Sequence, residues 1–323
     1  MANKHTQLIV SAAPHVNAPT DVACIMKDVC IALVPAIFAA TYVFGFSAIL
    51  MVLVCCAACV FFEWVTRRIL KRSNTLGDWS AMVTGVILAL NLPVTLPYWM
   101  AVVGCFIAIV VVKQIFGGLG QNFANPAIVG RIALFVGFAS QMSTWKVTQR
   151  MSDVIINAAG VDAVSGPTPL GLWEKGLELP SYLEMFLGNI NGSLGETSAL
   201  ALLIGGIYLI VRKVIEPTIP LSFIGTVAVM ALVFGEDPLF HILAGGVMLG
   251  AIFMATDYVT SPITRSGKII FGVGCGVLTM LIRMYGSYPE GVSFAILFMN
   301  VLVPHIDNLT KHAAFGVEKG GKK

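Results

Sequence analysis

Residues 47–65 read SAILMVLVCCAACVFFEWV, an apolar run in which Glu63 is the single charged residue. A helix rises about 1.5 Å per residue, so a run of this length crosses the roughly 30 Å hydrocarbon core of a bilayer. Similar runs recur along the 323 residues, of which 57% are hydrophobic and only 11% charged. Because soluble domains carry about 25% charged residues, the composition predicts an all-α integral membrane protein.

Hydropathy predicts about ten transmembrane segments along the chain. They are residues 27–44, 47–65, 79–92, 98–116, 125–140, 197–215, 221–235, 239–258, 269–284 and 291–306. The corresponding regions are a cytoplasmic N-terminal segment (1–26), a first five-helix repeat (27–140), an external loop (141–196), a second five-helix repeat (197–306) and a cytoplasmic basic tail (307–323). Residues 1–20 are polar and contain no apolar core, so we expect no secretory signal peptide.

The basic residues predict the orientation of these segments. If the N-terminus is cytoplasmic, fifteen Lys and Arg residues fall on the inner side and four on the outer side, with Arg131 inside the membrane. Cytoplasmic loops carry an excess of basic residues, so both termini are expected in the cytoplasm and residues 141–196 outside. The chain is therefore expected to be a multi-pass protein of a prokaryotic cell (inner) membrane.

The third and eighth segments are interrupted by polar residues and prolines. The third runs into NLPVTLP at 91–97, and the eighth into ATDYVTSP at 255–262. At an offset of 165 positions, residues 85–97 and 250–262 share five identities, which indicates a two-fold repeat of five segments each. Because five is odd, the second repeat would enter the membrane from the opposite side. Broken helices at matching places in inverted repeats are typical of the central site of transporters.

Polar residues near these breaks are candidates for an ion pathway. The set comprises Asp257, Thr256, Thr95, Asn91 and Asp78. A carboxylate such as Asp257 is costly near hydrocarbon, so it should have a partner or line a hydrated path. The alternative for Asp257 is that it caps the broken helix and pairs with a nearby basic residue. For Asp78, capping of the third segment is the simpler interpretation.

Two further features could bind an anionic cofactor. Arg131 within the fifth segment would either form a structural ion pair or bind an anionic group. The glycine-rich stretch 113–126 reads KQIFGGLGQNFANP. Its candidate cofactor-binding residues are Gly117, Gly118, Gly120, Asn122 and Asn125. The alternative is a tight turn in which Asn125 caps the next helix.

Other kinds of site have little support in the sequence. Most of the seven cysteines lie in apolar segments and the five histidines are scattered, so no metal site is predicted. No catalytic residues are predicted either. The net charge of +3 is distributed along the membrane segments, which argues against nucleic-acid binding.

The external loop contains the stretch 162–171, DAVSGPTPLG, in which Thr168 stands between two prolines. Its Asp162, Ser165, Gly166 and Thr168 resemble the Asp-x-x-Ser/Thr-Gly-Ala-Thr motif at which a flavin transferase esterifies FMN to the final threonine. That motif is found in the NqrB/RnfD family of membrane flavoproteins, which includes RnfD of Rnf complexes and NqrB of the sodium-pumping NADH:quinone reductase. This chain has Pro167 where the family usually has alanine.

The resemblance covers nearly the whole chain. It includes the stretches 113–127, 255–257, 288–291 and 295–300. The short N-terminus and the Pro169-Leu170 pair look more like RnfD than NqrB. The resemblance implies a ten-helix flavoprotein that carries FMN on Thr168 through a phosphoester. It also implies a second, unattached flavin, riboflavin, on the cytoplasmic side.

The same resemblance implies a function and partners. The chain would belong to a membrane complex that passes electrons between ferredoxin and NAD and moves sodium ions or protons, and it would not be active alone. Its partners would be the other Rnf subunits, which include a second FMN-bearing subunit and iron–sulfur subunits, and, during maturation, the flavin transferase. Two alternatives remain: NqrB of the quinone reductase, and a redox-silent channel resembling urea transporters.

Overall fold

A computed structural model describes residues 21–145, 166–286 and 290–311, and the regular structure in this part of the chain is entirely helical. Four helices are long and apolar enough to cross a membrane, namely α1 (Val22–Phe44), α2 (Phe46–Ile69), α14 (Arg265–Tyr285) and α15 (Val292–Leu309). Shorter apolar helices are α3 (Ser80–Leu90), α4 (Tyr98–Phe106) with its π-helical continuation η2 (Ile107–Gln114), α5 (Pro126–Gly137), α10 (Ala199–Val211) and α11 (Thr218–Phe234). The prediction of an all-α membrane protein is confirmed.

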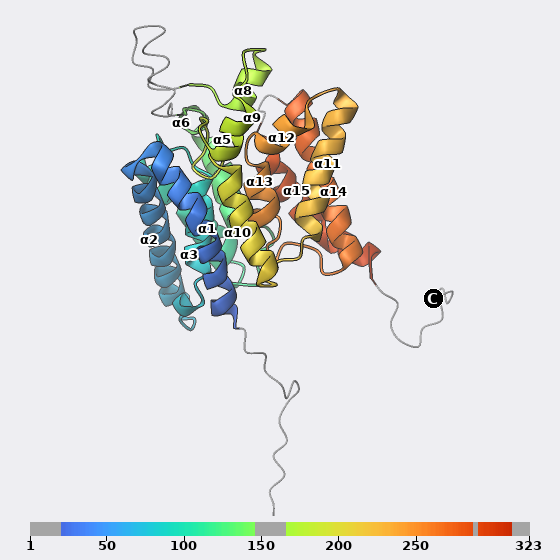
Figure 1. The fold of residues 1–323 in the computed structure, drawn as a ribbon. Helices are drawn as coiled ribbons and strands as arrows, with labels where there is room; N and C mark the ends of the chain where they lie inside the picture. The colour runs from blue at the N-terminus through green and yellow to red at the C-terminus, as the bar shows by residue number, and fades with distance from the viewer. Residues whose placement is uncertain (1–20, 146–165, 287–289, 312–323) are drawn as a thin grey trace, which may run out of the picture.

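Short elements connect the longer ones. They are η1 (Leu76–Asp78), α6 (Ala139–Met142), α8 (Pro169–Glu174), α9 (Tyr182–Leu187), α12 (Pro238–Leu243), α13 (Val247–Leu249) and the π-helical η3 (Gly250–Met254). Figure 1 shows that α1 begins and α15 ends at one end of the bundle, which we call the terminal end, whereas α8 and α9 lie at the opposite end, the loop end.

Close helix packing pairs elements from the two halves of the chain. α1 packs against α10, and α5 against α15, while α11 packs against α14 within the second half. Small residues allow these contacts: a Cβ added at Gly205 of α10 would collide with the backbone carbonyl of Ala32 in α1. In the membrane, such close approach of backbones replaces the hydrophobic driving force that water provides to soluble folds.

The third segment is broken as expected. α3 ends at Leu90, and the chain then turns through residues 91–97 before α4 begins. Carbonyl groups exposed by the break are satisfied from the other half of the chain: Gly195 N–H donates to Leu90 O at 2.6 Å, and Leu194 N–H to Leu92 O at 3.2 Å. An unsatisfied carbonyl at membrane depth would cost several kcal/mol, so these bonds make the break tolerable.

The eighth segment differs from the prediction, because it is interrupted before Ala255 as well as after it. α12 ends at Leu243, and Gly245 adopts a positive φ of 65° before α13 begins. The guanidinium of Arg283 accounts for this earlier break, since it donates to the carbonyl of His241 at 2.6 Å and to that of Ala244 at 2.8 Å. Hydropathy depends only on local composition, so it does not reveal this break. The donor that satisfies the open carbonyls, Arg283, lies about 40 positions away in the sequence.

Candidate functional sites

A cavity of about 450 Å³ opens at the loop end beside Thr168. Its lining includes the aromatic rings of Trp145 and Phe135, the hydroxyl-bearing Ser143 and Thr144, and the charged Lys175 and Glu290. We call it the loop cavity. Ligand sites of this kind commonly range from about 300 to 1,000 Å³, so its volume suits a small organic group.

Thr168, which the sequence places in the external loop, is buried, with only 8% of its surface exposed. It is the N-cap of α8, and its Oγ1 accepts a hydrogen bond from Gly171 N–H at 3.2 Å. Of its motif partners, Gly166 also lines the loop cavity, whereas Asp162 and Ser165 lie outside the described residues. The capping role explains why Thr168 and Pro169 occur together, since proline is favoured at the first helical position.

Buried charges lie next to the loop cavity. Arg131 Nη2 is 2.6 Å from Glu290 Oε2 and 3.6 Å from Glu196 Oε1, and its Nη1 donates to Ser293 Oγ at 2.9 Å. Of the two interpretations of Arg131, the structural ion pair therefore has direct support. Glu290 also lines the loop cavity, so this ion pair connects the cavity to the interior of the bundle.

Asn91 joins the two interrupted regions. Its Oδ1 accepts from Arg131 Nη1 at 3.1 Å, while its Nδ2 lies 3.4 Å from the sulfur of Met254 at the end of η3. Asn125 contacts the same region from the start of α5, since its Nδ2 donates to Met254 O at 3.2 Å. The broken third and eighth segments thus meet in the core.

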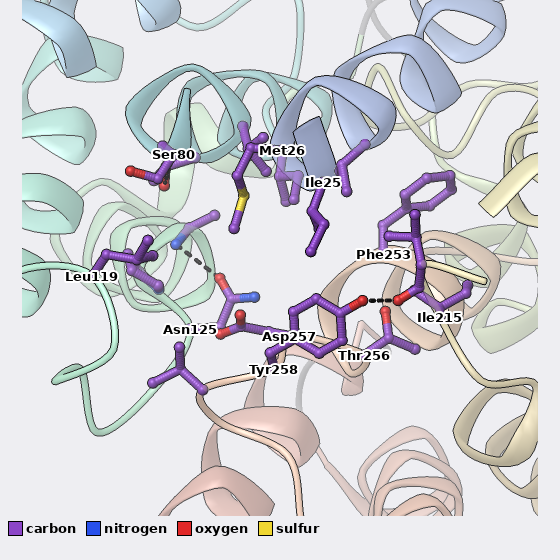
Figure 2. Close-up of a pocket in the computed structure, with 18 of the residues that line it drawn as sticks. Ile25, Met26, Ser80, Leu119, Asn125, Ile215, Phe253, Thr256, Asp257 and Tyr258 are labelled. Atoms are coloured by element: carbon purple, nitrogen blue, oxygen red, sulfur yellow. Dashed lines mark hydrogen bonds between the residues drawn. The ribbon is translucent and has the colours of Figure 1, made fainter. Parts of the chain in front are cut away.

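A second cavity, of about 90 Å³, lies at the terminal end between α1, α3, α10 and η3; we call it the terminal cavity (Figure 2). Its walls are mostly apolar, and Figure 2 shows the oxygen-bearing side chains of Ser80, Asn125, Thr256 and Asp257 around it. Its volume admits several water molecules, because each needs only about 10–15 Å³ of accessible space.

The carboxylate of Asp257 is hydrogen-bonded to a nearby hydroxyl and not paired with a basic residue. Thr260 Oγ1 donates to Asp257 Oδ2 at 2.9 Å. Lys268, one of the nearby basic residues, instead pairs with Glu216 at 2.8 Å. In the described ranges no ion pair is formed by Asp257, which leaves its carboxylate at the wall of the terminal cavity.

Only part of the predicted ion-pathway set comes together. Thr256 and Asp257 both line the terminal cavity. Thr95, by contrast, is exposed and donates to Thr144 O at 2.5 Å, and Thr144 lines the loop cavity. The expectation that Thr95 contributes an oxygen beside Asp257 is therefore wrong: the turn after α3 carries Thr95 to the loop end of the bundle.

The glycine-rich stretch forms a turn next to the terminal cavity. Gly117, Gly118 and Gly120 have φ of 132°, 108° and 90°, a region that side chains disfavour. Asn122 lines the terminal cavity, and Asn125 caps α5 by accepting from Ala127 N–H at 3.0 Å. This geometry agrees with the tight-turn interpretation, while the two asparagines also present amide groups to the cavity.

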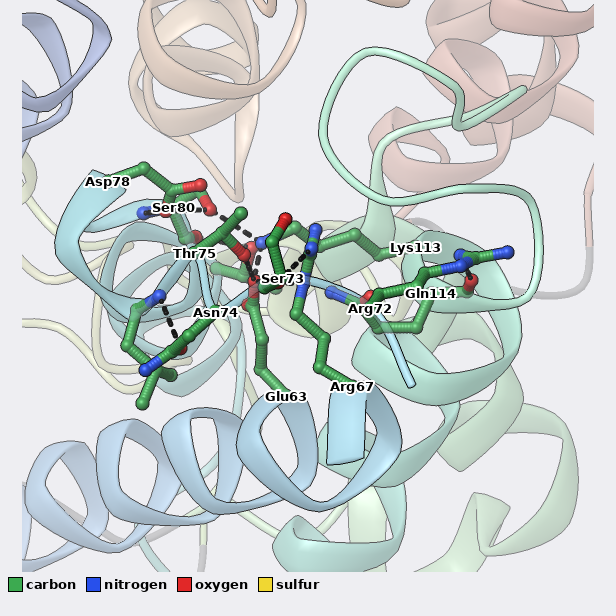
Figure 3. A network of polar contacts seen from close by, with 12 residues as sticks. Glu63, Arg67, Arg72, Ser73, Asn74, Thr75, Asp78, Ser80, Lys113 and Gln114 are labelled. Atoms are coloured by element: carbon green, nitrogen blue, oxygen red, sulfur yellow. Dashed lines mark hydrogen bonds and ion pairs between the residues drawn. The ribbon is translucent and has the colours of Figure 1, made fainter. Parts of the chain in front are cut away.

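Asp78 is connected to the terminal cavity through hydrogen bonds of Ser80. Its Oδ1 accepts from Ser80 N–H at 2.8 Å at the start of α3, although Trp79 and not Asp78 is the N-cap residue of that helix. Ser80 Oγ in turn accepts from Lys113 Nζ at 2.6 Å, and Lys113 pairs with Glu63 at 2.8 Å (Figure 3). Lys113 and Ser80 both line the terminal cavity, so this buried network forms part of its wall.

Several largely buried ionisable residues with structural partners had no predicted role. Among them are Asp28, Glu63, Glu196, His241 and Glu290. A partner for Glu63 could have been predicted, because an acidic residue inside a membrane segment needs one. Glu196 stands directly before the sixth segment, where the same reasoning applies. The partners themselves could not be read from local sequence.

Residues 9–316 match the family model described as the NQR2, RnfD, RnfE family. The chain is 47% identical to the D subunit of the Na(+)-translocating ferredoxin:NAD(+) oxidoreductase complex of Acetobacterium woodii, over 97% of this chain and 96% of that protein. It is 42% identical to the D subunit of the proton-translocating ferredoxin:NAD(+) oxidoreductase complex of Clostridium ljungdahlii, over 96% of each chain. It is 41% identical to the D subunit of the ion-translocating oxidoreductase complex of Stutzerimonas stutzeri, over 92% of this chain and 93% of that one. The chain therefore belongs to the NQR2, RnfD, RnfE family.

Proposed function

We propose that the chain is the RnfD membrane subunit of an Rnf-type, ion-translocating ferredoxin:NAD oxidoreductase. The three relatives described above are named as D subunits of ferredoxin:NAD(+) oxidoreductase or ion-translocating oxidoreductase complexes, and each is covered almost completely. NqrB of the quinone reductase is the alternative within the same family. The urea-transporter-like channel has no support from these relatives.

The chain is proposed to carry FMN on Thr168 through a phosphoester. The observation that carries this proposal is the position of Thr168 at the wall of the loop cavity. Trp145 and Phe135 offer aromatic surface to a flavin ring. Lys175 offers a positive charge for its phosphate, in a lining that also contains the carboxylates of Glu174 and Glu290. When attached, FMN supplies one- and two-electron transfer; the protein's part is to hold it and tune its environment.

The attachment is tested by in-gel fluorescence and by the mass of the peptide that contains residue 168. Thr168→Ala should abolish fluorescence, but it also removes a helix cap, which costs about 0.5–2 kcal/mol. Thr168→Asn is the sharper variant, because asparagine caps helices well and lacks the hydroxyl nucleophile. Thr144→Ala, which changes a threonine on the same cavity, is the control and should keep its fluorescence. A fluorescent Thr168→Asn band would refute the attachment.

Riboflavin, the second flavin implied by the resemblance, does not fit the terminal cavity in its present form. That cavity measures about 90 Å³, well below the roughly 300 Å³ at which small-molecule sites begin. A bound riboflavin would need this cavity to widen. The proposed cofactor chemistry therefore rests on Thr168 alone.

Ion translocation is assigned to the terminal cavity and the interrupted helices beside it. Asp257 and Thr256 supply hard oxygen ligands suited to sodium, and a carboxylate there could equally accept a proton. One relative is named as sodium-translocating and another as proton-translocating, so family membership does not choose between the ions. Electron transfer itself would need the iron–sulfur and second FMN-bearing subunits, and flavin loading would need the transferase.

We also infer ten membrane crossings arranged as two inverted five-helix repeats. Support comes from the packing of helices across the halves, α1 with α10 and α5 with α15. The interrupted helices meet at Asn91 and Met254, where the two halves would be related by the pseudo-two-fold axis. In this topology the termini are cytoplasmic and the Thr168 loop is external.

A further inference from the structure

A hollow of about 400 Å³ lies at the terminal end, beyond the last turn of α2. Four of the residues that line it are basic: Arg67, Arg68, Lys71 and Arg72. The remaining two are Trp64 and Asn74. We call this group the basic hollow. It is separate from the terminal cavity, with which it shares no lining residue.

Backbone carbonyls hold the two inner guanidinium groups in place. Arg67 Nη1 donates to Ser73 O at 2.8 Å, and Arg72 Nη1 donates to Gln114 O at 2.9 Å. Figure 3 shows Arg67 rising from α2 and Arg72 lying beside Gln114. Carbonyls are neutral, so these bonds fix the position of both cations without neutralising either charge. The site is therefore preorganised for an anion.

Carboxylates balance little of this charge. In the described residues Glu63 forms an ion pair with Arg67, 3.8 Å from its Nε, but it lies closer to Lys113, at 2.8 Å. In residues 21–145, 166–286 and 290–311, no carboxylate forms an ion pair with Arg68, Lys71 or Arg72. Arg67 is 8% exposed, and its Nε has no hydrogen-bond partner.

A strained backbone conformation after α2 brings the basic side chains together. Lys71 adopts a φ of 53°, a left-handed conformation that non-glycine residues rarely take. It turns the chain directly after α2, so that Arg72 folds back toward Gln114 of η2. Arg67 and Arg68, in the last turn, also complement the helix dipole. Lys71 and Arg72 lie beyond the helix, and the dipole does not account for them.

An apolar strip on α2 leads into the basic hollow. Trp64 is 42% exposed and Phe61 55%, and their ring centroids are 6.4 Å apart. The guanidinium of Arg68 stacks over Trp64, 5.1 Å from the ring centroid. Tryptophan favours the level of lipid headgroups, so this stack marks the membrane interface. The acyl chains of a lipid can pack against this strip while its headgroup contacts the basic residues. An acidic water-soluble protein would contact the basic residues but not the apolar strip.

We propose that the basic hollow binds the phosphate headgroup of an anionic phospholipid, whose acyl chains lie along Phe61 and Trp64. Arginine pairs with phosphate oxygens through two parallel N–H donors, which makes Arg67 and Arg72 the principal ligands. Arg68 and Lys71, which are exposed at the edge of the basic hollow, add electrostatic attraction for the headgroup. The proposal does not depend on the flavin or on the ion that is translocated.

Quenching of tryptophan fluorescence by brominated lipids tests this site in the full-length chain. The protein is reconstituted in phosphatidylcholine vesicles that contain the same fraction of either brominated phosphatidylglycerol or brominated phosphatidylcholine. The difference between the wild-type chain and Trp64→Phe isolates the signal of Trp64. We expect Trp64 to be quenched at lower fractions of the anionic lipid than of the neutral one.

The variant Arg68→Gln/Lys71→Asn should weaken the preference for the anionic lipid about fivefold for each charge removed. Asparagine tolerates positive φ, so Lys71→Asn keeps the turn, and the single variant serves if the double variant does not fold. The matched control is Lys213→Asn, because Lys213 also has a positive φ, of 58°, and also follows a membrane helix at the terminal end.

Two results would overturn the proposal. Equal quenching of wild-type Trp64 by both brominated lipids would exclude an anionic lipid and point to an acidic partner protein or free phosphate as the occupant. Equal loss of preference in Lys213→Asn and Lys71→Asn would mean that general surface charge, and not the basic hollow, attracts the lipid. Loss in Lys71→Asn with retention in Lys213→Asn supports the site.

Discussion

The guanidinium of Arg131 and the carboxylate of Glu290 are 2.6 Å apart although the residues are 159 positions apart in the chain. Arg131 belongs to α5, and Glu290 lies just before α15. The pair therefore ties the two halves together beside the loop cavity. Through Asn91 the same guanidinium also holds the broken end of α3, so a single side chain links the cavity of Thr168 to the interrupted helices.

Arg131→Ala should destabilise the chain by about 3–5 kcal/mol, because it removes the ion-pair partner of the largely buried carboxylates of Glu196 and Glu290. Thermal unfolding of the purified chain in detergent measures the effect. Arg212→Ala is the control: Arg212 pairs with Asp28 at 3.1 Å, but its side chain is 56% exposed. Asp28 is buried but keeps its hydrogen bond from the Tyr208 hydroxyl at 2.9 Å, so we expect a smaller loss than in Arg131→Ala. Equal losses in the two variants would contradict the importance of burial.

Gly118→Ala should destabilise the turn more than Gly120→Ala. Both glycines have positive φ, so both variants incur backbone strain. A Cβ at Gly118 would also lie 2.6 Å from Arg67 Nη2, whereas nothing lies within 4 Å of a Cβ at Gly120. We expect about 1 kcal/mol from the strain alone and a further loss at Gly118, measured by thermal unfolding. Equal losses would show that Arg67 moves aside without cost, and a larger loss in Gly120→Ala would contradict the prediction.

The proposed topology predicts opposite accessibility of two positions outside the described residues. Single cysteines at Ala163 and Gly320, in a cysteine-free background, should react with an impermeant maleimide from opposite sides of the membrane. The fifteen-to-four distribution of basic residues predicts Gly320 inside and Ala163 outside. Labelling of both cysteines from the same side would exclude this topology.

Asp257→Asn should reduce ion uptake per electron in the assembled complex in vesicles while covalent FMN remains. Asparagine preserves size and hydrogen bonding to Thr260 but removes the charge at the terminal cavity. The control is Glu216→Gln, which removes an acid that is exposed at the same end and paired with Lys268. Unchanged uptake and unchanged sodium dependence in Asp257→Asn would leave Asp257 with a structural role only.

Local sequence was enough to predict the membrane class, the approximate extents of the apolar helices and the capping of α5 by Asn125. Each of these depends on residues close together in the chain, such as the long apolar run of α2 or the Asn-Pro pair before α5. The length of an apolar run decides whether it spans hydrocarbon, and a cap needs only its own helix end. Membrane spans and helix caps can therefore be predicted from the sequence without knowing which helices pack together.

The packing of the helices determines which buried charges meet and which predicted site residues stay apart. Glu63 and Lys113 come from different helices, and Arg283 satisfies the carbonyls at the break after α12. Thr95 and Asp257, which repeat symmetry suggested as neighbours, lie at opposite ends of the bundle. A buried charge or an open carbonyl in a membrane must find a partner, but the partner is set by the arrangement of whole helices, which hydropathy and local motifs do not specify.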